Sequence, residues 1–218
     1  MANPVVIAID GPAASGKGTL ARRLARHLGY AYLETGRLYR AVAAKVLDAG
    51  FDPADEAAAA RVAQGLVAAD LEHPKLFEPE TTAAASTVAA HGAVRAALLQ
   101  RQRDFAVNPP GGAPGVVVDG RDIGTHVFPG ADHKIYLAAS PDIRAERRVA
   151  QLREQGREAI YQRVLADIQD RDRRDETRRH SPLARAKDAH LLDTSTLDAD
   201  QVFNQALTLI AADPNPAD

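Results

Sequence analysis

Nine consecutive residues near the start of the chain have the types and the order of a phosphate-binding loop. They are Gly11, Pro12, Ala13, Ala14, Ser15, Gly16, Lys17, Gly18 and Thr19. The glycines let the backbone turn tightly, so that successive N–H groups can point at phosphate oxygens. The lysine adds a full positive charge, and a helix beginning inside the loop adds the partial charge of its N-terminus. We therefore predict that the loop binds the phosphates of a nucleoside triphosphate. The alternative is a glycine-rich turn that only joins a strand to a helix.

The hydroxyl group of this loop stands one position later than in the commonest form of the motif, where Ser or Thr directly follows the lysine. Here Gly18 follows the lysine, and the hydroxyl belongs to Thr19. Asp119 stands at the end of the third predicted strand, and a carboxylate in that position faces the crevice where ligands bind in α/β proteins. We expect Thr19 and Asp119 to hold a Mg²⁺ ion mainly through water molecules.

A phosphate loop alone does not identify a reaction, because GTPases, motor ATPases and small-molecule kinases share it. Charged residues that follow two of the predicted strands give further information. Arg37 and Arg40 are three residues apart on a predicted helix and could clamp one phosphate, although helix arginines are often merely solvated. Thr35 could cap that helix. Arg121 and Asp122 follow a buried strand, and we expect them in the cleft rather than in a plain surface turn.

A third cluster, residues 171–179, contains five arginines and three acids. On a continuous helix Arg171, Arg174, Asp175 and Arg178 would share one face. They could form a lid over transferring phosphates, or only a salt-bridged surface helix. RNA binding would also suit arginines, but the segment has no aromatic residues for base stacking. A second, less specific basic cluster follows Ser140-Pro141 and contains Arg144, Arg147 and Arg148.

Short apolar runs alternate with helical segments, which predicts an α/β fold with a parallel sheet. The predicted strands are Val5–Ile9, Tyr30–Leu33, Val116–Val118, Lys134–Ala138 and His190–Leu192. The predicted helices are Lys17 to Gly29, Gly36–Ala49, Asp55–Ala69, Thr81–Val107 and Ala199–Ala211, and the charged segments after Pro141 and around residue 171 are helical as well. The clearest loop follows Val107.

Length and composition indicate a globular protein with one domain that carries small inserted subdomains, or at most two domains. The 218 residues are 45% hydrophobic and 26% charged, with a net charge of −2, so a core is available and any basic site must be local. The chain has no cysteine, which excludes disulfides, thiolate metal sites and a cysteine nucleophile. No apolar segment has the length of a signal peptide core or a bilayer span. We expect a cytoplasmic protein.

These residues together resemble the bacterial cytidylate kinases, a family of P-loop nucleoside monophosphate kinases. The likeness runs almost from end to end. It rests on the loop at 11–19 and on several later stretches: Thr35-Gly36 with Tyr39-Arg40, Ala84-Ala85-Ser86, Val94-Arg95, Asp119 to Thr125, Arg171-Asp172, Asp175, Arg178 and Pro182-Leu183. Each stretch is a weak signal alone, but all of them in this order are specific.

The resemblance implies transfer of the γ-phosphoryl group of ATP to CMP or dCMP with Mg²⁺. It implies that the loop holds the ATP phosphates and that Lys17, Arg121, Arg171 and Arg178 act in catalysis. The implied acceptor-phosphate ligands are Thr35, Arg40, Arg121 and Arg178; the implied cytosine ligands are Ser86, Arg95 and Asp122; and the implied sugar ligands are Arg171 and Asp175.

The implied architecture is a three-layer α/β/α P-loop kinase fold with a central five-stranded parallel sheet, in one kinase domain spanning 1–218. The expected core is about 1–35, 112–145 and 186–218, with a helical acceptor-binding subdomain at about 36–111 and a helical lid at about 150–185. We expect a monomer that binds neither nucleic acid nor membrane. The rival readings are a kinase for another nucleoside monophosphate or for shikimate, and a regulatory or RNA-binding module.

Overall fold

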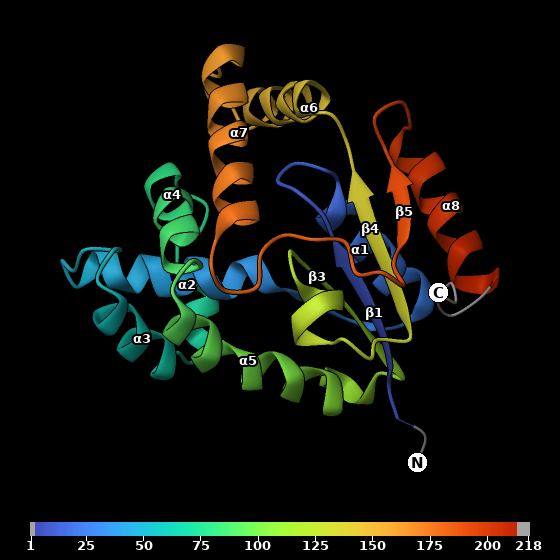
Figure 1. Cartoon of the computed structure of the whole chain (residues 1–218), viewed down its shortest axis with the longest axis horizontal. Coiled ribbons are helices and arrows are strands. Elements are labelled where there is room, and N and C mark those ends of the chain that lie inside the picture. Colours follow the sequence, from blue (N-terminus) through green and yellow to red (C-terminus); the bar gives the residue numbers. More distant parts are fainter. Residues whose placement is uncertain (1–2, 213–218) are drawn as a thin grey trace.

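The computed structural model describes residues 3–212, which form a five-stranded, entirely parallel sheet flanked by helices (Figure 1). The strand order is β2-β3-β1-β4-β5. The strands are β1 (Val5–Asp10), β2 (Ala31–Glu34), β3 (Gly115–Gly120), β4 (His133–Ala138) and β5 (His190–Asp193). In the register of β1 and β3, Asp10 lies beside Gly120 and Ile9 beside Asp119. The predicted five-stranded parallel sheet is therefore confirmed.

Alternating side chains of the central strands pack against helices on both faces. Ile7 and Ile9 of β1 belong to a core cluster with Leu20 and Leu24 of α1 (Lys17–Leu28) and with α8 (Ala199–Ala212). Ala8, between those isoleucines, packs instead with Ala106 of α5 (Gly92–Val107) and with η3 (Ile123–Val127), a single π-type turn. This period of two is the consequence of the strand pleat. The predicted three-layer arrangement is confirmed.

The helices between β2 and β3 have a hydrophobic core of their own. They are α2 (Thr35–Asp48), α3 (Glu56–Gln64), η1 (Ala68–Glu72), α4 (Pro79–Val88) and α5, followed by η2 (Pro110–Gly112). Leu38 and Val42 of α2, Val88 of α4 and Leu98 of α5 are among its fully buried members. We call these elements the helical block. The functional division of the chain into core, acceptor subdomain and lid stays a prediction.

Two helix predictions in this block were wrong in extent. The helix expected over 55–69 ends at Gln64, because Gly65 follows and Leu66 turns inward, where it is 2% exposed. The helix expected over 81–107 is two helices separated at Ala89–His91. His91 Nε2 bonds to the carbonyl oxygen of Pro53 at 2.9 Å, and a Cβ atom on Gly92 would lie 2.9 Å from the His180 ring. Distant contacts therefore fix the break.

The helices α6 (Pro141–Glu154) and α7 (Tyr161–Thr177) form a pair with a small core of Ala145, Val149, Val164 and Ile168. Figure 1 shows α7 standing beside α4 on the far side from α8. Because α7 ends at Thr177, the prediction that Arg178 shares a helix face with Arg171 and Arg174 is wrong. Arg178 has extended backbone angles, which redirect its side chain. In the described part of the chain, no helix is long and apolar enough to cross a membrane.

Candidate nucleotide-binding cleft

The phosphate loop joins β1 to α1, as predicted. Gly11 has a φ of 146°, and a Cβ atom there would lie 2.3 Å from the carbonyl oxygen of Leu137, so the position requires glycine. Lys17 is 6% exposed, and its ammonium group donates a hydrogen bond to the carbonyl oxygen of Pro12 at 2.8 Å. Burial and the nearby Arg121 guanidinium lower the pKa of Lys17. A polyanion in the loop would offset both effects.

Asp119 lies at the end of β3, beside the start of α1. A Cβ atom on Gly18 would be 3.6 Å from its carboxylate, and the Tyr32 hydroxyl donates a hydrogen bond to Oδ1 at 3.2 Å. Burial raises the pKa of Asp119 to about 6, against the opposing charge of Lys17. Thr19 is exposed in the first turn of α1. Residues 3–212 contain no group of three His, Asp or Glu side chains that could enclose a metal ion.

Asp10 organises the cleft, and the sequence analysis did not single it out. Its two carboxylate oxygens accept hydrogen bonds from the backbone N–H groups of Ile123 at 2.8 Å and Gly124 at 2.7 Å. Burial raises the pKa of Asp10 to about 6 although these bonds favour the charged form. The contacts fix η3, which directly follows Asp122. The sequence signal that could have identified Asp10 is an acidic residue at the end of the first strand, directly before Gly11.

The acceptor side begins at Thr35 and Arg40. The Thr35 hydroxyl donates to the carbonyl oxygen of Asp119 at 2.8 Å, so it joins α2 to β3 and does not cap the helix. Arg40 pairs with Glu34. Arg37 points elsewhere: it donates to the carbonyl oxygen of Leu71 at 2.6 Å and pairs with Glu72 at 2.8 Å. The two arginines therefore do not act as one clamp in this conformation.

Asp122 is the centre of the buried charges farther along the cleft. It pairs with Arg95 of α5, which also donates to the carbonyl oxygen of Ala89 at 3.1 Å. Arg178 approaches its other carboxylate oxygen at 3.4 Å. The side chains of Asp122, Arg95 and Arg178 are each 5–7% exposed. Ser86 of α4 is buried as well. The structure thus brings a buried carboxylate and two guanidinium groups together at this end of the cleft.

Asp175 of α7 links this cluster to Arg121, which follows β3. It accepts a hydrogen bond from Arg121 at 2.9 Å and lies 3.7 Å from Arg178. Burial alone would raise the pKa of Asp175. The guanidinium groups of Arg121, Arg171 and Arg178 outweigh it and hold this pKa below its usual value. Burial, together with the repulsion of Arg121, lowers the pKa of Arg171 to about 10. Arg174, in contrast, is exposed and does not enter the cleft.

Several buried polar atoms of these residues have no hydrogen-bond partner among the described residues. They are the Oγ atom of Ser86 and the Nε atoms of Arg40, Arg95 and Arg171. Unsatisfied buried donors are costly, and native proteins rarely keep them without a ligand or water. All four atoms belong to residues implied to bind the acceptor nucleotide. A polar ligand in this cleft would satisfy them.

The second basic cluster, after Pro141, is partly structural. Arg144 donates to the carbonyl oxygens of Ala13 at 3.1 Å and Ala139 at 2.9 Å, and it pairs with Asp172 of α7 at 2.6 Å. Arg147 bonds to the Thr194 hydroxyl at 3.0 Å. Arg148 bonds to Gln151 at 2.7 Å. Sequence reasoning did not recognise that Arg144 ties the phosphate loop to both α6 and α7.

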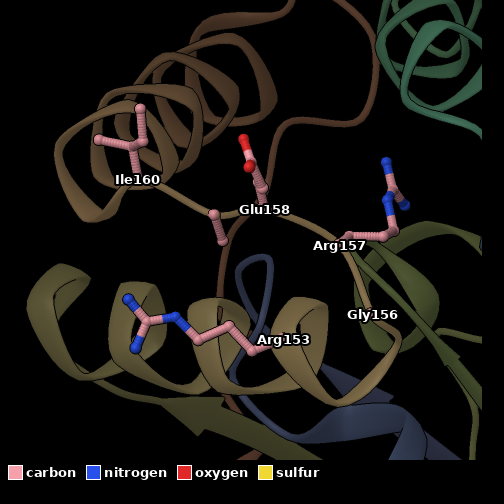
Figure 2. A pocket seen from close by; sticks show the side chains of 6 residues that line it. Arg153, Gly156, Arg157, Glu158 and Ile160 are labelled. Carbon is pink, nitrogen blue, oxygen red and sulfur yellow. The ribbon is translucent and has the colours of Figure 1, made fainter.

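One cavity lies away from the Arg95–Asp122–Arg178 cluster, and a smaller one borders the cluster through Arg95. The larger, of about 470 Å³, is an open hollow at the turn between α6 and α7 (Figure 2). Its lining residues are Arg153, Gly156, Arg157, Glu158, Ala159 and Ile160. The smaller, of about 270 Å³, lies along α5 and includes Arg95, His126 and His180. No residue implied by the resemblance lines the larger cavity, so it was not predicted as a site.

Comparison with known proteins decides the family. The cytidylate kinase family model matches residues 7–212. The chain belongs to the cytidylate kinase family. It is 56% identical over 207 residues to the cytidylate kinase of Paramagnetospirillum magneticum, covering 95% of this chain and 98% of that one. It is 53% identical to the cytidylate kinase of Acidiphilium cryptum over 210 residues, covering 96% and 97%.

The family membership makes this chain a phosphotransferase, with ATP as its co-substrate. The relative from Rhodospirillum rubrum, also a cytidylate kinase, is 52% identical over 207 residues, 95% of this chain and 97% of that one. A solved structure of an uncharacterized protein from Eubacterium ventriosum has the same fold, with a TM-score of 0.57 at 12% identity, covering 95% of this chain and 99% of that one. The recognition of the family from the sequence is confirmed.

Proposed function

We propose that the enzyme transfers the γ-phosphoryl group of ATP to the phosphate of CMP or dCMP, forming ADP and CDP or dCDP. The observation that supports this acceptor most directly is the buried Arg95–Asp122–Arg178 cluster, together with the buried and unpartnered hydroxyl of Ser86 on α4. It lies in the cleft of a chain whose relatives are named cytidylate kinases.

The cluster has the donors and acceptors that cytosine needs. Cytosine presents an amino group as donor and N3 and O2 as acceptors. The Asp122 carboxylate can accept from the amino group, while Arg95 and Ser86 can donate to the ring acceptors. Uracil would place a carbonyl oxygen where the carboxylate expects a donor, leaving buried polar groups unpaired. Such mismatches discriminate strongly between otherwise similar substrates.

The remaining cations suit the phosphates. We assign the acceptor phosphate to Thr35, Arg40, Arg121 and Arg178, the acceptor sugar to Arg171 and Asp175, and the ATP phosphates to the 11–19 loop with Lys17. The transition state spreads negative charge over the oxygens of the transferring group, so several positioned cations stabilise it. No protein nucleophile is required, because an oxygen of the CMP phosphate attacks the γ-phosphorus and ADP leaves.

Mg²⁺ fits the residues present. Thr19 ends the phosphate loop, and the Asp119 carboxylate lies near Gly18, which directly precedes it. A single carboxylate with a hydroxyl is typical of Mg²⁺ sites that are completed by phosphate oxygens and water. When bound, the ion would neutralise charge on the ATP phosphates.

We propose the functional division of the chain on the same grounds. The sheet with its phosphate loop (about 1–35, 112–145 and 186–218) binds the donor. The helical block, within about 36–111, contributes Arg40, Ser86 and Arg95 to the acceptor site. Residues from about 150 to 185 contribute Arg171, Asp175 and Arg178, and act as a lid. We further propose a cytoplasmic monomer.

A parallel substrate panel tests the proposal. ATP consumption would be measured with CMP, dCMP, UMP, AMP and shikimate, with Lys17→Ala as the inactive control. We expect turnover with both cytidine nucleotides, much weaker use of UMP, and none with shikimate. Turnover with UMP or AMP but with neither cytidine nucleotide would overturn the proposal. RNA binding with a steep salt dependence and no nucleotide turnover would favour the binding-module alternative.

A further inference from the structure

Phe77 is an exposed aromatic residue held in a fixed turn at the edge of the cleft. It lies between η1 and α4 and is 56% exposed. The preceding Leu76 is 1% exposed and belongs to the core of the helical block, and its N–H donates to the carbonyl oxygen of His73 at 3.2 Å. His73 and Lys75 both bind Asp48 at the end of α2, at 2.9 and 2.7 Å. Leu76, His73 and Lys75 therefore anchor the turn to the helical block, while the phenyl ring of Phe77 stays exposed to solvent.

The ring lies next to the guanidinium group of Arg40. The distance from the Arg40 Cζ atom to the ring centroid is 4.7 Å, well within the range of a cation–π interaction. Arg37 is farther from the same ring, at 6.0 Å. The Arg40 guanidinium also pairs with the Glu34 carboxylate, and it lies close to Gly36, where a Cβ atom would be only 3.1 Å from Nη1.

The Phe77 ring orients Arg40 without occupying any of its hydrogen-bond donors. A carboxylate in the place of Phe77 would bind N–H groups and cancel the positive charge. An aromatic face attracts the cation but leaves the in-plane N–H groups free. The Nε atom of Arg40 indeed has no partner among the described residues, and Glu34 is bonded to Nη2. A guanidinium that is oriented but not saturated is suited to bind an incoming phosphate.

We infer that Phe77 is a positioning residue for the acceptor phosphate: its ring holds the guanidinium of Arg40 in the orientation that binds the phosphate of the nucleoside monophosphate. This inference rests on the proposed role of Arg40. It assigns Phe77 no contact with the transferring group. Phe77 should therefore affect the affinity for the acceptor more than the rate of transfer or the affinity for ATP.

Steady-state kinetics of three variants test the inference. Phe77→Leu keeps an apolar side chain but removes the aromatic face, whereas Phe77→Trp keeps that face. Phe51→Leu is the matched control. Phe51 is 45% exposed and lies between α2 and α3, and among the described residues no arginine stacks on its ring. We expect Phe77→Leu to raise the KM for CMP about five- to tenfold, with the KM for ATP and the melting temperature unchanged. Phe77→Trp and Phe51→Leu should stay within about twofold of the parent enzyme.

The same Phe77 substitution in an Arg40→Gln enzyme shows whether the change in the KM for CMP depends on Arg40. In an Arg40→Gln enzyme, which has lost the cation, adding Phe77→Leu should change the KM for CMP no further. The inference is overturned if Phe77→Leu leaves the KM for CMP unchanged, if Phe77→Trp is as impaired as Phe77→Leu, or if the two substitutions prove additive. An unmodified enzyme that does not phosphorylate CMP would instead contradict the proposed function, so the two failures are distinguishable.

Discussion

Asp122 occupies a position where three charged side chains share a small volume that is nearly closed to solvent. Its carboxylate neutralises Arg95 and Arg178, which would otherwise repel one another at low exposure. In the proposed function the same carboxylate recognises the amino group of cytosine. A single residue thus serves both the folded state and the choice of substrate, and kinetics must separate the two roles.

We expect Asp122→Asn to lower kcat/KM for CMP by about a hundredfold, because the amide presents a donor to the amino group of the base and removes a buried charge. The KM for ATP should stay within about threefold, since the phosphate loop is a separate site. Steady-state kinetics with each substrate varied in turn provide the measurement. Asp104→Asn, on the exposed side of α5, is the matched control. Equal losses for CMP and ATP would contradict base recognition by Asp122.

The pKa of Asp119 predicts an acid limb in the pH profile. Because burial raises this pKa to about 6, the carboxylate is charged above that pH and becomes neutral as the pH falls through it. If charged Asp119 is needed for Mg²⁺, kcat/KM for ATP should fall about tenfold between pH 7 and pH 5. Asp119→Asn should be less active at pH 7 but lack this limb. The protonation of ATP itself affects the unmodified enzyme and the Asp119→Asn variant equally, so it cannot account for a difference between their pH profiles. An unchanged limb in the variant would exclude Asp119 as its origin.

Residue types and order alone indicated the phosphate loop, Asp119, Arg121 and Asp122, because they stand at strand ends where ligands bind. Ser86 and Arg95 came only from the family resemblance, since nothing in their local sequence distinguishes them from other helix residues. Asp10 was not singled out, and the structural role of Arg144 was not recognised. The partners of Asp10, and Ala13 as a partner of Arg144, lie more than a hundred residues away in sequence. Arg174 was placed on the same face as Arg178, but the helix ends between them.

At the scale of elements, α6 connects the phosphate loop with α7. Arg144 is the connection: one side chain contacts the loop at Ala13, the end of β4 at Ala139 and Asp172 on α7. The strands and most helices were predictable from apolar periodicity. The break between α4 and α5 was not, because alanine-rich sequence favours a continuous helix and the contacts of His91 and Gly92 that interrupt it are distant in sequence.

Replacing Arg144 by methionine should lower the free energy of unfolding by about 3 kcal/mol, because Asp172 loses its buried partner. The KM for ATP should also rise several-fold, since the bond that supports the phosphate loop at Ala13 is lost. Urea denaturation and ATP-dependent kinetics are the measurements. Arg153→Met, at an exposed position of the same helix, should change neither. Equal behaviour of the two variants would contradict the role given to Arg144.

At the scale of the whole molecule, three parts meet: the sheet with its phosphate loop, the helical block and the α6–α7 pair (Figure 1). Ion pairs join the three parts, as in the contact of Arg121 with Asp175 and that of Arg95 with Asp122. The parallel sheet and its layers followed from the alternation of strands and helices. The way the helical block faces α7 did not, because it depends on contacts among these charged side chains.

We expect the helical block and the α6–α7 pair to approach each other when both nucleotides bind, because water in the cleft would hydrolyse ATP. The chain has no cysteine, so two can be introduced for specific labelling. Ala69 in η1 and Gln162 in α7 are exposed positions on the two parts. Energy transfer between dyes at these sites should increase with CMP plus a non-hydrolysable ATP analogue. Unchanged transfer in the ternary complex would contradict closure.

The central claim is that this cleft selects cytosine for phosphoryl transfer from ATP. Its most direct test is the ratio of kcat/KM for CMP to kcat/KM for UMP in the unmodified enzyme, measured as nucleoside diphosphate formed at saturating ATP and Mg²⁺. The arrangement of Ser86, Arg95 and Asp122 predicts a ratio of about a hundred or more. A ratio near one, or a preference for UMP, would contradict the account.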